Sequence, residues 1–227
     1  MPSVTRPEVW GTCMALAWLL SVSNPSPITA AEVETRDFVV SIDGKKAGEY
    51  RMSIKRQDDG TLLMNGTADV KVSYLVYNYT YAFRGTEIWK DGRLQRLFTN
   101  ANDNGKKLSL IATADGDSLR ITANGQQRKS RSDLWTTTYW RLADARFRDR
   151  TVPLLDADTG KEINATLKYV GTAEIKVGSS AQNCAHYRVT GGGVQADLWY
   201  DSQERLVRQE SIEDGHKTVL ELSQIRR

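Results

Sequence analysis

Side chains that could act in catalysis are few in this sequence and lie far apart. The chain has 2 histidines, His186 and His216, so a metal site built from several histidines is excluded. Cys184, His186 and Arg188 alternate along one segment, which would place them on one face of a strand. A thiolate beside an imidazole and a guanidinium would have a lowered pKa and could be a nucleophile. Successive side chains on one face of a strand lie about 7 Å apart, too far for a thiol–imidazole hydrogen bond, so we interpret these residues as polar surface.

A pair of carboxylates is the remaining acid–base candidate. Acid–base hydrolysis needs two groups in one cleft with pKa values pushed apart, and Glu87 and Asp156 could supply them. The sequence contains no serine-hydrolase elbow, Walker loop, His-Glu-x-x-His or Cys-x-x-Cys motif. The glycine run 191–193 lies between two strand patterns without a following helix, which is typical of a turn or bulge rather than a phosphate loop. We therefore expect no metal and no cofactor.

Aromatic residues form a more suggestive set. The odd-numbered residues of 77–83, among them Tyr79 and Tyr81, are all aromatic and alternate with other residues, so they could line an apolar ligand cavity or belong to an ordinary core. The apolar residues of 70–76 occupy the even-numbered frame, and this change of frame predicts a bulge or corner within one long strand. Trp199 lies on a polar strand face, which indicates either recognition or burial under residues 132–150.

Turn dipeptides divide the chain beyond residue 32 at nearly regular intervals. They are Asp43-Gly44, Asp59-Gly60, Asp91-Gly92, Asn104-Gly105, Asp115-Gly116, Asn124-Gly125 and Asp214-Gly215. Asp, Asn and Gly tolerate the positive φ of tight hairpin turns. Between the turns apolar residues alternate with polar ones, as in strands with one face exposed to water. This pattern predicts an all-β fold, an antiparallel meander of roughly a dozen strands curled into a barrel-like or strongly bent sheet.

One segment, residues 132–150, has no turn dipeptide and no clean alternation. Ser132 or Asp133 could cap a helix, and the apolar residues that follow have nearly helical spacing. We therefore predict one short helix near residues 133–147, although the threonine run 136–138 is unfavourable in a helix. A lone helix of this kind could plug or cover the curled sheet.

The charge balance is mild overall and uneven along the chain. The formal net charge is +3, and the sequence pI of about 8.8 lies below the range typical of nucleic-acid-binding domains, so we expect no nucleic-acid partner. Basic residues clearly outnumber acidic ones within residues 126–150. This stretch could face anionic lipid headgroups or an acidic partner, or could simply be solvated surface.

The first thirty-one residues have the order of a secretory signal. Arg6 precedes an apolar run over residues 9–22, and small residues end at Ala31. The run is shorter than the ~20 residues that span a bilayer, and no second one follows, so we expect no membrane-spanning segment. We predict a signal peptide over 1–31, cleaved after Ala30 or Ala31, and a single β-rich domain over 32–227 in the periplasm or outside a bacterium. Cys13 would leave with the signal, so the mature chain could form no internal disulfide.

Seven stretches follow the pattern of a known family, and they are residues 39–48, 79–81, 87–94, 102–106, 137–140, 154–160 and 197–201. Together they resemble an uncharacterised exported bacterial family, the group called domain of unknown function 6134, which is distantly similar to the β-rich group numbered 3108. The resemblance implies an exported bacterial β-sheet protein. It implies no activity, cofactor or catalytic residue. One departure is Arg141, since Asn or His is expected after the Tyr-Trp pair at 139–140.

From these patterns we expect a non-enzymatic protein that binds a lipid-like or small amphipathic ligand, or an envelope partner. The residues expected to make apolar contact are Tyr79, Tyr81, Trp135, Tyr139, Trp140 and Trp199, with Arg141 near the mouth of the site. A carboxylate-dependent hydrolase using Glu87 and Asp156 is one alternative. A purely structural envelope component is another, and it predicts neither a cavity nor a cleft.

Overall fold

The fold is a single 15-stranded sheet, seen in a computed structural model that describes residues 32–74, 77–213 and 215–227. The predicted signal peptide lies outside these residues. The first strands are β1 (Val33–Ile42), β2 (Lys45–Arg56), β3 (Leu62–Tyr74), β4 (Tyr77–Lys90), β5 (Arg93–Asp103), β6 (Lys106–Asp115), β7 (Ser118–Ala123) and β8 (Gln126–Arg131). Then come β9 (Trp135–Thr136), the 3-10 turn η1 (Ala145–Phe147), β10 (Arg150–Leu155), β11 (Glu162–Val177), β12 (Ser180–Gly191), β13 (Val194–Tyr200), β14 (Leu206–Glu213) and β15 (His216–Arg226).

The hairpins form where the turn dipeptides predict them. Asp43, Asp91, Asn104 and Asn124 have φ of 48–50°, and the glycine after each also has positive φ. Two successive positive φ values are the signature of the type I′ turn, whose twist matches that of the flanking strands. The local sequence therefore sets the meander, and the predicted all-β fold is confirmed.

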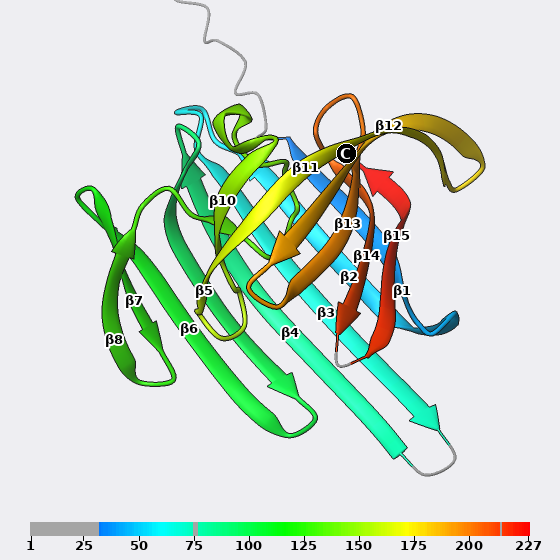
Figure 1. The fold of residues 1–227 in the computed structure, drawn as a ribbon, viewed down its shortest axis with the longest axis horizontal. Helices are drawn as coiled ribbons and strands as arrows, with labels where there is room; N and C mark the ends of the chain where they lie inside the picture. Colours follow the sequence, from blue (N-terminus) through cyan, green and yellow to red (C-terminus); the bar gives the residue numbers. More distant parts are fainter. Residues whose placement is uncertain (1–31, 75–76, 214) are drawn as a thin grey trace, which may run out of the picture. The chain divides into compact units, whose positions relative to one another are not determined.

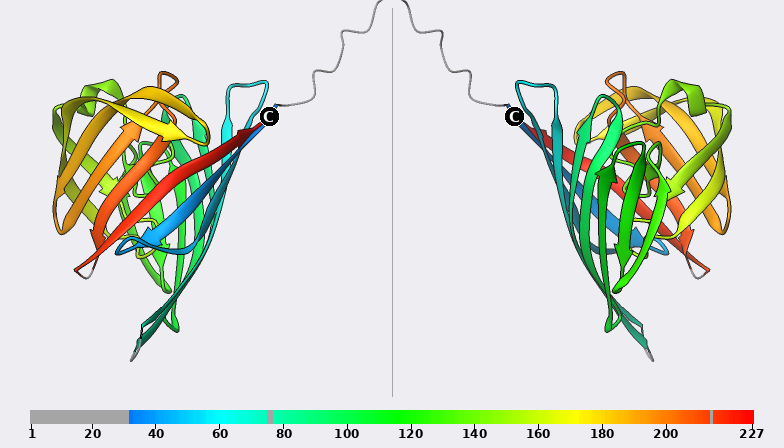
Figure 2. Two further views of the ribbon diagram at one scale, coloured as in Figure 1. Left: turned by 90° about the vertical axis from the view of Figure 1, so that its right-hand side faces the viewer. Right: turned by 90° about the vertical axis from the view of Figure 1, so that its left-hand side faces the viewer.

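The sheet bends strongly because its first and last strands pair. β1 lies between β2 and β15, so two meanders join in the middle of the sheet, and the edge strands are β8 and β9. The sheet is not closed, since these two edges do not pair with each other. Strands β10 to β13 lie in front of β3 to β6 in Figure 1, and the side views of Figure 2 show the two halves facing each other. The observed sheet is therefore curled and barrel-like, as the strand pattern predicts, and it remains open.

Residues 132–162, here called the inner segment, include β10 and the turn after it, and their apolar side chains face the inside of this curve. The segment does not form the predicted helix. The only helical turn in the described part of 133–147 is η1, three residues long. Trp135 and Thr136 instead form a parallel bridge to β10, and Tyr139 has φ of 49°, outside the helical region. The β-branched threonine run 136–138 favours this extended path over a helix. The apolar side chains of the segment are nevertheless buried in the core.

The frame change near residue 75 has a simpler cause than a bulge. β3 and β4 pair as antiparallel neighbours, with Val72 opposite Tyr79 and Tyr74 opposite Tyr77. An even-numbered residue therefore always faces an odd-numbered one, so the inward-facing frame switches from one strand to the next. Residues 70–74 and 77–83 belong to two separate strands rather than to one long bulged strand, which corrects the sequence-based prediction.

The turn between β10 and β11 packs tightly on the inner face of β5 to β7. Thr99 Oγ1 donates to the Ala157 carbonyl at 2.5 Å, and Arg128 of β8 bonds both the Gly160 carbonyl and Glu162. A Cβ atom at Gly160 would lie 2.8 Å from Leu110 Cδ1. The inner segment therefore fills the space that an internal ligand would need.

We predict that Gly160→Ala destabilises the fold more than the control Gly116→Ala. Both glycines have positive φ, 72° and 63°, so alanine strains the backbone at both positions. Only at 160 does the new methyl meet core atoms, since at 116 nothing lies within 4 Å. The expected difference in unfolding free energy is about 1–3 kcal/mol, measured by urea denaturation. Equal losses would contradict the close packing of this turn.

Candidate functional site

One buried carboxylate, that of Glu87 on β4, organises the interior. Its Oε2 accepts from the indole Nε1 of Trp89 at 2.6 Å and of Trp140 at 2.9 Å. Thr136 and Thr138 donate their hydroxyls to the two carboxylate oxygens, at 3.2 and 2.6 Å. Glu87 has no exposed surface, and this burial raises its pKa while the four hydrogen bonds oppose the rise. The carboxylate ties β4 to the inner segment and is enclosed by its donors.

Trp140 is fixed from its backbone as well as from its ring. Arg36 of β1, which is 5% exposed, donates Nη1 to the Trp140 carbonyl at 2.7 Å. Arg36 also donates Nε to Glu34 at 2.7 Å, and Arg205 bonds the same Glu34 at 3.1 Å. A cluster of charged side chains, with Arg36 buried and Glu34 and Arg205 partly buried, therefore holds the backbone that leads to Arg141.

Arg141 is a half-buried cation without a counter-ion. Its guanidinium carbon lies 4.9 Å from the ring centroid of Trp89 and 5.9 Å from that of Trp140, within cation–π range. Trp135 Nε1 donates to the Arg141 carbonyl at 2.9 Å and so fixes the backbone. Across residues 32–74, 77–213 and 215–227 the guanidinium has neither a hydrogen bond nor an ion pair. Burial lowers the pKa of Arg141, and the charge of Glu87 opposes this.

Arg141 lies on the wall of a small depression beside the β4–β5 turn, which we call the rim notch. Its walls include Trp89, Leu134, Trp135, Arg141, Arg146 and Phe147. The volume is about 20 Å³, which is enough for roughly one water molecule. Arg146 has carboxylates close by, Asp133 at 3.8 Å and Asp144 at 3.9 Å, so Arg141 is the cation in the notch whose charge is not matched.

The opposite end of β4 is acidic. Tyr81 donates its hydroxyl to Asp158 Oδ2 at 2.8 Å, from β4 to the β10–β11 turn. Burial raises the pKa of Asp158 to about 6; the Tyr81 hydrogen bond lowers it, and the charges of Asp156, Glu213 and Asp103 raise it further. The two ends of this strand therefore carry opposite charges near the interior.

The structure brings together only some of the predicted site residues. Trp135, Tyr139 and Trp140 are 3–4% exposed and belong to the core, and Trp135 also lines the rim notch. Tyr79 and Tyr81 are half-buried at the other end of β4, away from the Trp89 end. These residues do not form one aromatic-lined cavity.

Trp199 lies apart from all of them. It stacks on His186 with ring centroids 4.4 Å apart and planes 10° apart, and the Arg208 guanidinium lies 5.7 Å from it. His186 bonds Asp197 at 2.6 Å, and Arg188 bonds the same carboxylate at 2.9 Å. Its contacts are therefore with neighbouring strands of the sheet, not with residues 132–150.

The alternative catalytic groups are held in structural roles. Asp156 Oδ1 accepts the backbone N–H of Asp158 and of Thr159 within a turn, while Glu87 is enclosed. Cys184 is fully buried rather than on a polar surface, and burial raises its pKa to about 11, so it carries no ready thiolate. Within the described ranges no cluster of His, Cys, Asp and Glu could hold a metal. Nor does any described helix have the length and apolarity to cross a membrane.

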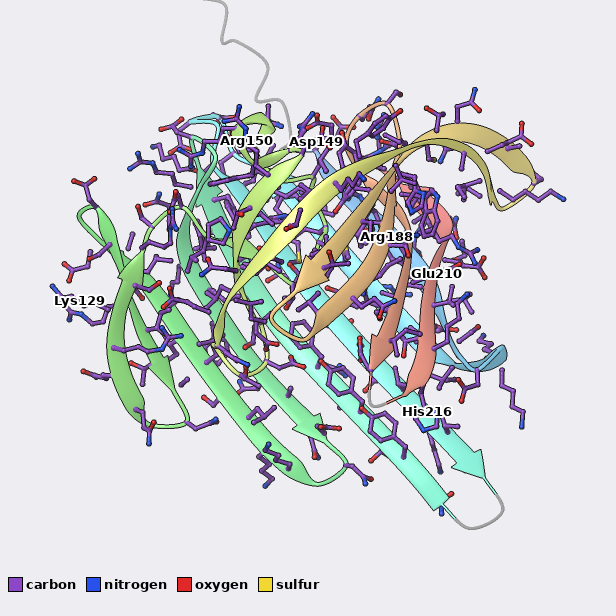
Figure 3. The ribbon with its side chains drawn as sticks, in the orientation of Figure 1. Lys129, Asp149, Arg150, Arg188, Glu210 and His216 are labelled. Carbon is purple, nitrogen blue, oxygen red and sulfur yellow. The ribbon has the colours of Figure 1, made fainter. Side chains whose placement is uncertain are left out.

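Most of the basic stretch 126–150 is neutralised locally. Arg128 pairs with Glu162, Arg131 with Asp133 at 2.5 Å, and Lys129 with Asp115 at 3.6 Å. Figure 3 places Lys129 on β8 and Arg150 beside Asp149 at the start of β10. The uneven charge of the sequence is thus mostly ion-paired surface, and Arg141 is the exception nearest the interior.

Sequence reasoning missed the role of Glu87 as the support of Trp140 and Arg141. A signal was present: Glu87 occupies the inward frame of β4, where its neighbours in that frame include Phe83 and Trp89. A carboxylate in an apolar frame must find hydrogen-bond donors inside the fold. Which donors it finds depends on residues about fifty positions away.

Comparison with other proteins identifies a family and a fold. The sequence profile of the family described as Domain of unknown function (DUF6134) matches residues 38–223. A crystal structure of a β-barrel-like protein of the DUF1849 group from Brucella abortus has a TM-score of 0.62 at 8% identity, over 86% of this chain and 98% of that one. A DUF1329 family protein from Desulfovibrio piger ATCC 29098 reaches a TM-score of 0.22 at 13% identity, over 86% and 85%. No curated protein matches at a significant level.

We predict that Glu87→Leu destabilises the protein by about 3–5 kcal/mol, because two buried indole N–H groups lose their acceptor. Glu87→Gln is the matched variant and is expected to cost much less. The amide oxygen can accept both indoles, and the Thr138 hydroxyl can accept from the amide nitrogen. Urea unfolding followed by tryptophan fluorescence measures both, and equal losses would show that the hydrogen bonds contribute little.

Asp158 predicts a pH-dependent stability. The pKa of Asp158 is raised from 3.8 to about 6 in the folded protein, so the folded state favours the protonated carboxyl. The stability that this protonated carboxyl contributes is fully present below about pH 4 and is lost as the pH rises to about 6. Asp158→Asn keeps an acceptor for Tyr81 without the charge. The variant should be more stable than the native protein at pH 7, by up to about 3 kcal/mol, and the two should converge near pH 4. A stability difference independent of pH would rule this out.

Proposed function

The chain belongs to the DUF6134 family, and we propose that it is a non-enzymatic binding protein that takes an amphipathic ligand or an envelope partner at the rim notch. The observation that carries the proposal is the Arg141 guanidinium, held against Trp89 and Trp140 and left without a counter-ion among the described residues. A partly desolvated cation that the fold positions but does not neutralise is a typical recognition group for an anion.

Binding is favoured over catalysis by the state of the acid–base groups. Glu87 and Asp156 both serve as hydrogen-bond acceptors within the fold, and neither is a free acid beside the notch. The two carboxylates that line the notch, Asp133 and Asp144, lie in ion pairs with Arg131 and Arg146. A hydrolase would need two poised groups in one cleft.

The notch is favoured over other places on the molecule. The interior between the two halves of the sheet is occupied by the inner segment. A larger open depression of about 300 Å³ lies over β3 and β4, with Asp69, Lys71 and Thr80 among its lining residues. The Asp69 carboxylate there already pairs with Arg84 at 2.8 Å, so this depression has no comparable desolvated charge.

Export is part of the proposal and rests on the signal-like pattern of residues 1–31. A protein working in the periplasm would meet lipids, cell-wall fragments and other envelope proteins, many of which carry anionic groups. The purely structural role differs in one respect, because it requires no ligand at the notch.

The test is native mass spectrometry of the protein isolated from the periplasm of its own organism. We expect an intact mass that begins at Ala31 or Glu32, and a bound small molecule or partner that is lost in Arg141→Gln. Arg150→Gln is the matched control, since Arg150 is exposed and has no ion pair among the described residues. An uncleaved chain would refute export. A clean apo monomer, or a ligand that Arg141→Gln retains, would refute binding at the notch.

A further inference from the structure

We propose that the group recognised at the rim notch is an oxyanion, a carboxylate or a phosphate, held jointly by Arg141 and Arg56. This inference rests on the proposed function and specifies its ligand. It adds a second residue, from β2, that sequence analysis did not single out.

The sheet register places Arg56 on the same sheet face as Trp89, a wall residue of the notch, although Arg56 does not itself line the notch. Arg56 lies opposite Leu62, and Leu62 lies opposite Trp89, the ring over which the Arg141 guanidinium sits. Residues directly opposite share one face of a sheet, and neighbouring strands are about 4.8 Å apart. Arg56 is therefore two strands from Trp89 on the same face, within the reach of an arginine side chain. The positive charge of Arg56 repels that of Arg141 and so lowers the pKa of Arg141.

Both guanidinium groups lack counter-ions. Arg56 is exposed and, like Arg141, forms neither an ion pair nor a side-chain hydrogen bond with the described residues. Two like charges in one place repel each other, and an anion between them would turn this repulsion into attraction. The planar guanidinium of Arg141 is fixed by the indoles, so its N–H groups are already oriented before a ligand arrives.

Nearby carboxylates have other partners. Asp133 and Asp144, which line the notch, pair with Arg131 at 2.5 Å and with Arg146 at 3.9 Å. Glu204 accepts from Arg148 at 2.6 Å. Glu87 faces its four donors in the interior. None of these side chains forms an ion pair with Arg141. An anionic ligand could therefore serve as its counter-ion.

The size of the notch limits what can enter. A volume of about 20 Å³ admits an oxygen atom of a carboxylate or phosphate but not an alkyl chain or a sugar ring. The rest of the ligand must therefore lie outside, along the half-buried side chain of Phe147, which lines the notch, and toward Leu62, which lies opposite Trp89 in the sheet. This favours a molecule with a small anionic head and an apolar or polymeric body.

The experiment is isothermal titration calorimetry of the protein comprising residues 32–227 with four probes. Three of the probes carry a chain of eight carbon atoms, and the fourth has no alkyl chain. The probes are octanoate, octyl phosphate, octyl glucoside and inorganic phosphate. We expect octanoate and octyl phosphate to bind, octyl glucoside to bind at least tenfold more weakly, and affinity to fall with added salt. Arg141→Gln and Arg56→Gln should each weaken binding at least tenfold, and Arg150→Gln should not. Arg141→Lys should also weaken it, because it keeps the charge but loses the planar fork.

The outcomes separate the two proposals. Equal binding of octyl glucoside and octanoate, with both weakened by Arg141→Gln, would leave the notch as the site but overturn the oxyanion. Binding unaffected by Arg141→Gln would overturn the notch itself. Binding of inorganic phosphate as tight as that of octyl phosphate would identify the free anion as ligand. If a peptide with a free C-terminal carboxylate binds more tightly than octanoate, and its amidated form does not bind, the oxyanion belongs to a protein partner.

Discussion

The burial of the Glu87 carboxylate is the constraint on which the site depends. A charge removed from water must be compensated inside the protein, and four donors from β4 and the inner segment do so. Three of those donors come from the inner segment, so the carboxylate holds this segment against β4. The same interaction fixes Trp89 and Trp140, and these two indoles hold Arg141. The proposed recognition by Arg141 at the surface therefore depends on the hydrogen bonds that compensate Glu87 in the core.

Curvature explains why binding is expected at a rim rather than inside. Pairing of β1 with β15 joins two meanders into one bent sheet, and bending alone would leave a hollow between the halves. The inner segment occupies that hollow with its apolar side chains. A fold of similar outline in the DUF1849 protein is described as β-barrel-like, which concerns the fold alone. In this chain the interior provides support, and the available chemistry lies at the strand ends.

Electrostatics differ between the two ends of β4. The Trp89 end faces the cations Arg141 and Arg56, while the Tyr81 end faces Asp158 and its neighbouring carboxylates. Elsewhere charges are largely satisfied across strands, as where Arg208 of β14 pairs with Glu221 of β15 and Lys217 of β15 pairs with Glu210 of β14. Cross-strand pairs of this kind hold the outer face without creating a binding site. In the proposed site the charges that would recognise a ligand are those that the fold orients but does not neutralise.

The sequence by itself determined the strands, the hairpin turns and the all-β class, because alternation and positive-φ turn residues act over a few neighbouring positions. It also indicated the family, through the stretches that resemble it. It could not determine the path of residues 133–147, since Trp135 and Thr136 pair with a strand almost twenty residues later. It named Trp135, Trp140 and Arg141 but not their different roles. Two of these are buried and one is a half-buried cation, and only contacts with Glu87 and Arg36, some fifty to a hundred residues away, decided which.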